Sequence, residues 1–132
     1  MWDWDLAKFM PEGELSRPAR SAGSVLVNRN VGGRDIVDVS NVVAVLRAVP
    51  GAAEQVAAIL ADAVESSRAE AGCRGYVLHH DRSDASRFVF VEQWAGMEAI
   101  EAHRQAPHYQ AMGKALAGLI AEREVMLLDA KA

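Results

Sequence analysis

The sequence predicts an α+β fold whose elements follow the order β-α-β-β-α-β, and three observations predict it. Runs of β-branched residues alternate with segments of helical period. A polar turn joins two of the runs, which indicates an antiparallel pair. Hydrophobic residues make up 51% of the 132 positions, so a chain of this length can bury one core without a disulfide or a metal.

The first strand and the first helix are separated by a turn. Val42 to Val49 is a β-branched run that stops at Pro50-Gly51, a turn-forming pair. Apolar residues then recur at helical spacing, which predicts an amphipathic helix over about 52–70 that ends at Gly72.

The second half of the order follows in the same way. Strands are predicted over 73–81 and 87–94, with the polar turn 82–86 between them. Helical spacing returns after Gly96, but Pro107 cannot lie inside an uninterrupted helix, so two helical pieces are expected. A last strand over 123–129 completes a ferredoxin-like arrangement with an antiparallel sheet.

About forty residues precede this domain, so we divide the chain into an N-terminal extension over 1–40 and a domain over 41–130. Residues 1–24 have no helical or strand period and predict a tail, or an arm that docks through Trp2 and Trp4. Gly32-Gly33 between two apolar runs predicts a β-hairpin over 25–39.

Composition excludes several classes of function. The net charge of −4 fits neither a nucleic-acid-binding protein nor a cationic membrane surface. Cys73 is the only cysteine, so no intrachain disulfide is possible. The acidic start has no long apolar run of the kind that a signal peptide needs, and we expect a cytoplasmic protein.

The strands are apolar on both faces, which predicts a homodimer. In the third strand, one side carries Phe88, Phe90, Glu92 and Trp94, and the other carries Val89, Val91 and Gln93. The helices can cover one face only, and an apolar face of several hundred Å² is seldom left in water. We expect two copies to pair through it about a two-fold axis. The alternative is that the N-terminal extension covers this face.

Three motifs at fixed spacing resemble the antibiotic-biosynthesis monooxygenase family. They are E-A-G-C-R-G-Y at 70–76, R-F-V-F-V-E-Q-W at 87–94 and E-A-H-R-Q-A-P-H-Y at 101–109. The typical family pattern is a helix ending in G-C, a strand ending in E-x-W and a helix bearing H-x-x-x-P-H-[YF]. The resemblance covers about two thirds of the chain, from about Asn41 to Ala130, and residues 1–40 match no motif.

The resemblance implies a dimeric α/β barrel and a cofactor-independent monooxygenase or quinol oxidase that acts with O2 on a phenolic or hydroquinone-like aromatic. Such a protein supplies a base and a dry apolar pocket, and neither a flavin nor a metal is expected. The sequence agrees, because it has no Gly-rich phosphate loop and no Cys-x-x-Cys, and the adjacent His79 and His80 lie on opposite strand faces. A non-catalytic dimeric barrel that binds a small ligand or has a structural role is the alternative.

Some members of the family degrade haem with an asparagine, a tryptophan and an iron-binding histidine. Trp94 matches the tryptophan, but the histidine position falls at Gly113 and the asparagine position falls near Ala44. Haem degradation is therefore disfavoured.

Glu92 and His103 are the candidate catalytic residues. Glu92 shares a strand face with Trp94 and other aromatics, where loss of hydration would raise its pKa and suit it to acid–base work. His103 lies on the apolar stripe of its helix and could accept a phenolic proton at neutral pH. The alternatives are a structural carboxylate, paired with His103 or an arginine, and a hydrogen-bonded core histidine.

The candidate substrate-binding residues are aromatic or basic. They are Trp94, Phe90, Tyr76, His79, Tyr109 and Arg47. Tyr76 and His80 share one face of the second strand and His79 lies on the other, so either face brings one histidine to the cavity. Arg47 would neutralise a buried carboxylate or a phenolate, or form a salt bridge at the rim of the sheet.

Overall fold

The computed structural model describes residues 39–132, so the tail and the predicted hairpin lie outside the described residues. The elements are, in order, β1 Ser40–Ala48, α3 Ala53–Asp62, α4 Val64–Arg68, β2 Cys73–His80, β3 Arg87–Trp94, α5 Met97–Gln105, α6 Pro107–Ala115 and β4 Ile120–Leu128. The predicted order β-α-β-β-α-β is confirmed.

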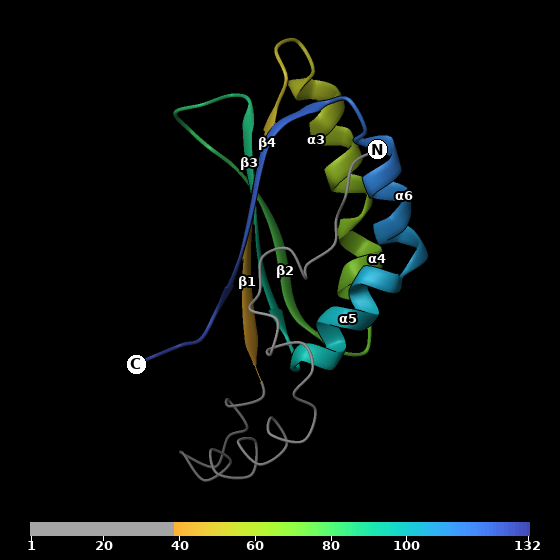
Figure 1. Ribbon diagram of the computed structural model, residues 1–132, viewed down its shortest axis with the longest axis vertical. Helices are drawn as coiled ribbons and strands as arrows, with labels where there is room; N and C mark the ends of the chain where they lie inside the picture. The colour runs from red at the N-terminus through yellow and green to blue at the C-terminus, as the bar shows by residue number, and fades with distance from the viewer. Residues whose placement is uncertain (1–38) are drawn as a thin grey trace, which may run out of the picture.

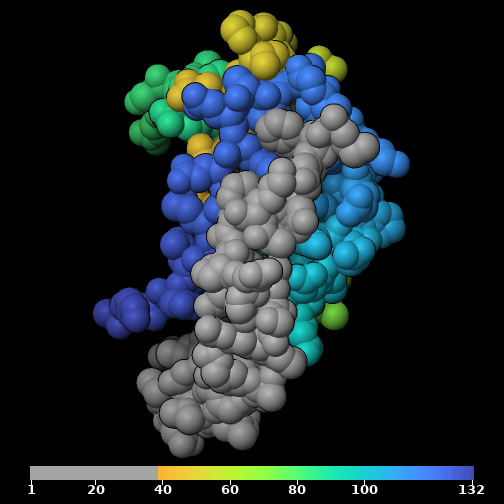
Figure 2. All heavy atoms as spheres, viewed as in Figure 1, coloured from red at the N-terminus to blue at the C-terminus, as the bar shows by residue number. Residues whose placement is uncertain are grey.

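The strands form one antiparallel sheet in the order β2-β3-β1-β4, and the helices lie against one of its faces (Figure 1). With all heavy atoms drawn, the same two layers are visible, with β4 on one side and α5 and α6 on the other (Figure 2). Within residues 39–132, no helix is long and apolar enough to cross a membrane.

The largest differences from the predicted elements are the division of one helix and the earlier starts of two strands. The helix predicted over 52–70 is divided at Ala63, whose N–H bonds to Leu60 O at 3.2 Å, a tighter turn than that of an α-helix. The last strand begins at Ile120 and the first at Ser40, because both exchange backbone hydrogen bonds beyond their β-branched runs. Apolar spacing does not mark such positions.

The predicted break at Pro107 is confirmed. Helix α5 ends at Gln105, and Ala106 adopts an extended conformation with φ −68° and ψ 144°. The residue before a proline is driven out of the helical region by the proline ring. Pro107 itself starts α6, where its missing N–H costs nothing.

Side chains alternate between the two faces of the sheet, and the core lies on the helix side. Leu46 of β1 is fully buried there, as are Phe90 and Trp94 of β3. On the opposite face, Val77 and Val91 stay 44% and 41% exposed although they are large and apolar. This face, composed of alternate residues of all four strands, is called the open face below.

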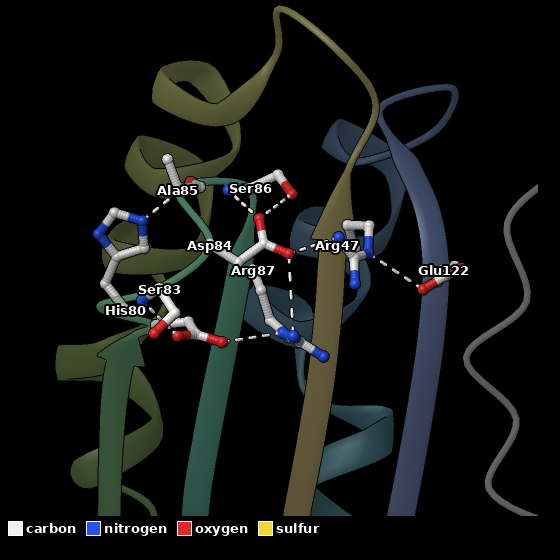
Figure 3. A network of polar contacts seen from close by, with 9 residues as sticks. Arg47, His80, Ser83, Asp84, Ala85, Ser86, Arg87 and Glu122 are labelled. Carbon is white, nitrogen blue, oxygen red and sulfur yellow. Dashed lines mark hydrogen bonds and ion pairs between the residues drawn. The ribbon is translucent and has the colours of Figure 1, made fainter.

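The turn between β2 and β3 is held by acidic side chains. Asp84 accepts hydrogen bonds from the backbone N–H of Ser86 at 3.0 Å and from its hydroxyl at 2.6 Å (Figure 3). These bonds lower the pKa of Asp84, and the charge of Arg47 nearby adds to the effect. Arg87 binds Asp81 at 3.0 Å across the same turn. The turn therefore fixes the pairing of the two strands by local bonds.

Gly72 is required by close packing between the start of β2 and α5. A Cβ atom at Gly72 would lie 2.4 Å from the Cβ of Ala99, closer than two carbon atoms can approach. We expect Gly72→Ala to lower the free energy of unfolding by about 1–3 kcal/mol, because α5 must move away from the sheet. Urea unfolding measures this, with Ala71→Ser at the exposed neighbouring position as the control. Equal stability of both variants would show that α5 adjusts freely.

Candidate functional site

A small cavity of about 30 Å³ lies between the sheet and the helices. Side chains from β1, β2, β3, β4, α5 and α6 enclose it. They are Val42, Ala44, Tyr76, Phe90, Glu92, Ile100, His103, Tyr109, Met112 and Val125. Glu92 and His103, the two candidate catalytic residues, are the members of this set that gain or lose a proton near neutral pH.

Glu92 is a buried carboxyl group on β3, with 6% of its surface exposed. The indole N–H of Trp94, two residues along the same strand face, donates to Glu92 Oε1 at 2.8 Å. Burial raises the pKa of Glu92 to about 7, the Trp94 hydrogen bond opposes this rise, and the charge of Glu70 adds to it. At neutral pH Glu92 is therefore present in both protonation states, as an acid–base catalyst needs to be.

His103 is a buried imidazole on α5, with 4% of its surface exposed. Its Nδ1 lies 2.7 Å from Glu70 Oε2. Burial lowers the pKa of His103, and the Glu70 contact opposes that change, so we treat the ring as neutral. An ionised carboxylate only accepts hydrogen bonds, so this contact assigns the proton to Nδ1. Nε2 is then left as the acceptor, and within residues 39–132 it makes no hydrogen bond.

His108, at the start of α6, shares the same partner. Its Nε2 lies 2.6 Å from Glu70 Oε2, so one carboxylate oxygen holds two imidazoles. Glu70 lies in the loop between α4 and β2 and is not among the candidate residues predicted from the sequence. Glu70 opens the first motif string and His103 and His108 belong to the third, but the strings do not show that these residues meet. The suggested pairing of Glu92 with His103 is wrong, since Glu70 takes that place.

An aromatic cluster surrounds these polar groups. Tyr76 lies 4.9 Å from Phe90 and 5.5 Å from His103, measured between ring centroids. Tyr109 lies 4.8 Å from His103 on another side, and Trp94 lies 4.5 Å from it. Burial raises the pKa of Tyr76 well above its ordinary value, so its hydroxyl stays protonated. Three uncharged aromatic side chains therefore surround the imidazole, and Glu70 is the charged group that contacts it.

The candidate substrate-binding residues divide into three groups. Phe90, Tyr76 and Tyr109 line the cavity. Trp94 does not line it, but its indole donates to Glu92 and packs against the ring of His103. His79 and Arg47 are not at the cavity. Both belong to the open face, because they alternate with neighbours that face the helices.

Arg47 has ion-pair partners of its own. It binds Asp84, and its Nε donates to Glu122 at 3.1 Å, so it forms the rim salt bridge and not a contact with a buried carboxylate (Figure 3). The histidine on the helix side of β2 is His80. It lies at the exposed end of the strand, where its ring stacks on Phe88 and its Nε2 contacts Ala85 O at 2.9 Å. Neither histidine of β2 therefore reaches the cavity.

Known proteins match this chain in sequence and in structure. A family model described as "Antibiotic biosynthesis monooxygenase" matches residues 40–115. The Escherichia coli K12 protein named "Probable quinol monooxygenase YgiN" is 31% identical over 98 residues, which are 67% of this chain and 94% of that protein. The crystal structure of PA3566 from Pseudomonas aeruginosa is 34% identical with a TM-score of 0.70, and it covers 72% of this chain and 96% of its own.

A further relative matches over a shorter stretch. The Synechocystis protein sll1783 is 32% identical over 60 residues, and the match spans 41% of its length and 46% of this chain. The matches to YgiN and PA3566 therefore cover nearly the full length of those proteins, whereas this one covers less than half of the relative.

Proposed function

This chain belongs to the antibiotic biosynthesis monooxygenase family, and from that premise we propose that it is a cofactor-independent monooxygenase or quinol oxidase acting with O2 on a phenolic or hydroquinone-like aromatic. One observation carries the proposal. His103 lines the cavity, and the contact of its Nδ1 with Glu70 leaves Nε2 as the nitrogen that can accept a proton. A carboxylate that orients an imidazole in this way makes it a general base and stabilises the imidazolium formed when it takes a proton.

In the proposed reaction, Nε2 of His103 takes the phenolic proton. The phenolate passes one electron to O2, which gives a phenoxyl radical and superoxide. In oxygenation these combine in a new C–O bond, and the O–O bond then breaks with loss of water, so a phenol and O2 become a quinone and water. In oxidation of a hydroquinone, two electrons and two protons pass to O2, and the products are a quinone and hydrogen peroxide.

Glu92 and the aromatic side chains complete the proposed site. With a pKa of about 7, Glu92 holds a proton in part of the molecules at neutral pH and can deliver it to reduced oxygen. Phe90, Tyr76 and Tyr109 would pack against the ring of the substrate. Their low polarity strengthens every charge interaction within the cavity.

The size of the cavity sets a condition on binding. It measures about 30 Å³, whereas a cavity that admits benzene measures roughly 150 Å³. A substrate must therefore displace part of the wall. Met112 of α6 is the unbranched, flexible side chain among the lining residues, so we assign the opening to it.

Oxygen consumption tests the function directly. The purified chain, freed of flavin and metal, is mixed with a panel of hydroquinones, naphthoquinols and simple phenols, and O2 uptake and peroxide are recorded together. We expect uptake above the autoxidation rate for at least one member of the panel. Peroxide equal to the O2 consumed indicates oxidation, and its absence indicates oxygenation. If a compound binds but no uptake occurs, the non-catalytic ligand-binding role is supported instead.

We also propose that two copies pair through the open face. Val91 lies between Val43 and Val77 in the strand register, and Met126 continues this apolar row on β4. The described helices cover the other side of the sheet, so a second copy of the same face is a suitable partner.

A charge at the centre of the open face should separate the proposed dimer. We expect Val91→Lys to weaken association by roughly 100-fold or more, because each copy would bury an unpaired ammonium group. Analytical ultracentrifugation over a range of concentrations measures the change. Gln55→Lys, which adds the same charge on the exposed side of α3, is the control. A Val91→Lys chain that still sediments as a dimer would place the contact elsewhere.

A further inference from the structure

Glu70, His103 and His108 bring three potential metal ligands to one point. Glu70 Oε2, His103 Nδ1 and His108 Nε2 all lie within 4.8 Å of one another. They come from the loop before β2, from α5 and from α6. We propose that these residues bind a divalent transition-metal ion, with Zn²⁺ as the best match. Sequence spacing gave no sign of this, because Glu70 and His103 are 33 residues apart.

The donor types suit zinc. Two imidazole nitrogens and one carboxylate oxygen form a common zinc ligand set, and they leave a fourth tetrahedral position for water. Ligand atoms on such an ion lie roughly 3.3 Å apart, given bonds of about 2.0–2.1 Å. The present separations from Glu70 Oε2 are 2.7 and 2.6 Å. Zinc binding therefore requires Glu70 Oε2 to move several tenths of an ångström away from both nitrogens.

The ion would take the place of the two N–H groups that bind Glu70. A metal requires the bare nitrogen lone pair, so the proton of each neutral ring would move to its other nitrogen. The site is shielded without being closed, since the side chains of His103, Glu70 and His108 are 5%, 15% and 22% exposed. Partial shielding strengthens the attraction between the carboxylate and a dication.

An entry path leads to the outer histidine. His108 lines a surface groove of about 220 Å³ between α3 and α6. Asp62 lines the same groove and places a carboxyl group where a hydrated cation would arrive. His103 lines the inner cavity from the other side. The three ligands thus lie between the surface groove and the cavity proposed as the reaction site.

Zinc binding would switch the role of His103, and this consequence rests on the proposed function. With the metal on Nδ1, the neutral ring carries its proton on Nε2, the nitrogen proposed as the base. His103 then donates a hydrogen bond and no longer accepts a phenolic proton. Zn²⁺ would therefore inhibit the oxygenase, and removal of zinc by a chelator would restore it.

Calorimetric titration of the chelator-treated full chain with Zn²⁺, without substrate, tests the site separately from the activity. We expect one zinc ion per chain and an affinity that falls tenfold or more in Glu70→Gln and in His108→Gln. His79→Ala and His80→Ala serve as controls, because with them all four histidines of the chain are accounted for. Their affinity should equal that of the unaltered chain.

Two outcomes would overturn the proposal. One is the absence of zinc binding by the unaltered chain, and the other is equal affinity of the unaltered chain and the folded His108→Gln chain. His108 is the outermost ligand, so its replacement disturbs the core least, and circular dichroism confirms that each variant is folded. Zinc binding by a chain that shows no oxygenase activity would support the metal site and contradict only the proposed function.

Discussion

His103→Ala should reduce substrate-dependent O2 uptake by about 10²- to 10⁴-fold, the usual contribution of one general base. This is the largest effect that we expect from a single substitution, and it corresponds to about 3–5 kcal/mol of transition-state stabilisation. The physical reason is that His103 lines the cavity and burial lowers its pKa. The ring is therefore neutral before the reaction, and its Nε2 can accept the phenolic proton. Steady-state oxygen electrode measurements at neutral pH provide the rate.

The control for this prediction is His80→Ala. It removes an exposed imidazole on β2 that lies outside the cavity, and it should leave the rate within about twofold of the original, since surface substitutions rarely matter. His103→Gln, which keeps a polar side chain of similar reach, separates loss of the base from loss of packing. If a folded His103→Gln chain consumed oxygen at the original rate, His103 would not be the base and Glu92 would take that role.

Glu92→Gln should remove a pH dependence of stability. The folded chain holds the Glu92 proton up to a pKa of about 7, whereas the ordinary value is 4.5. Below pH 4.5 both states are protonated. As pH rises from 4.5 to about 7, the unfolded chain releases the proton first. The free energy of unfolding therefore falls over this range, and the stabilising effect of the neutral carboxyl is lost above pH 7. The full loss is about 3 kcal/mol, by order of magnitude.

Urea unfolding at pH 5 and pH 8 measures this loss. The quantity compared is the difference in free energy of unfolding between Glu92→Gln and the unaltered chain at each pH. Titrating groups that do not interact with Glu92 contribute equally to both chains, so the difference reports on Glu92 and on the groups coupled to it. We expect the variant to gain about 3 kcal/mol relative to the unaltered chain between the two pH values. Glutamine can still accept the indole hydrogen bond of Trp94, so packing is preserved. A difference that does not change with pH would mean that Glu92 stays ionised in the folded chain.

The fold could be predicted from the sequence because its signals are local. The turn after Val49, the turn over 82–86 and Pro107 each mark a boundary by their own chemistry, and alternation correctly placed Glu92 and Trp94 on one face. The division of the first helix at Ala63 was missed, because a backbone turn among helix-forming residues leaves no trace in apolar spacing.

The candidate site was predicted only in part, for a different reason. Alternation separates the two faces of a strand but does not say which face meets the helices, so His79 and Arg47 were grouped with residues that lie across the sheet from them. Glu70 reaches His103 only through the folded arrangement of the loop and α5. Tertiary contacts of this kind are not encoded in any short window of sequence.

The extended residue at Ala106 has a geometric consequence for the two histidines beyond it. In an unbroken α-helix, residues five apart differ by about 140° in direction, since each residue turns the chain by about 100°. His103 and His108 are separated by five positions, yet both rings reach the same oxygen of Glu70. The extended linkage before Pro107 resets the phase between α5 and α6. Pro107 thereby brings two histidine side chains to the same oxygen atom, although it does not itself line the cavity or donate a hydrogen bond to Glu70.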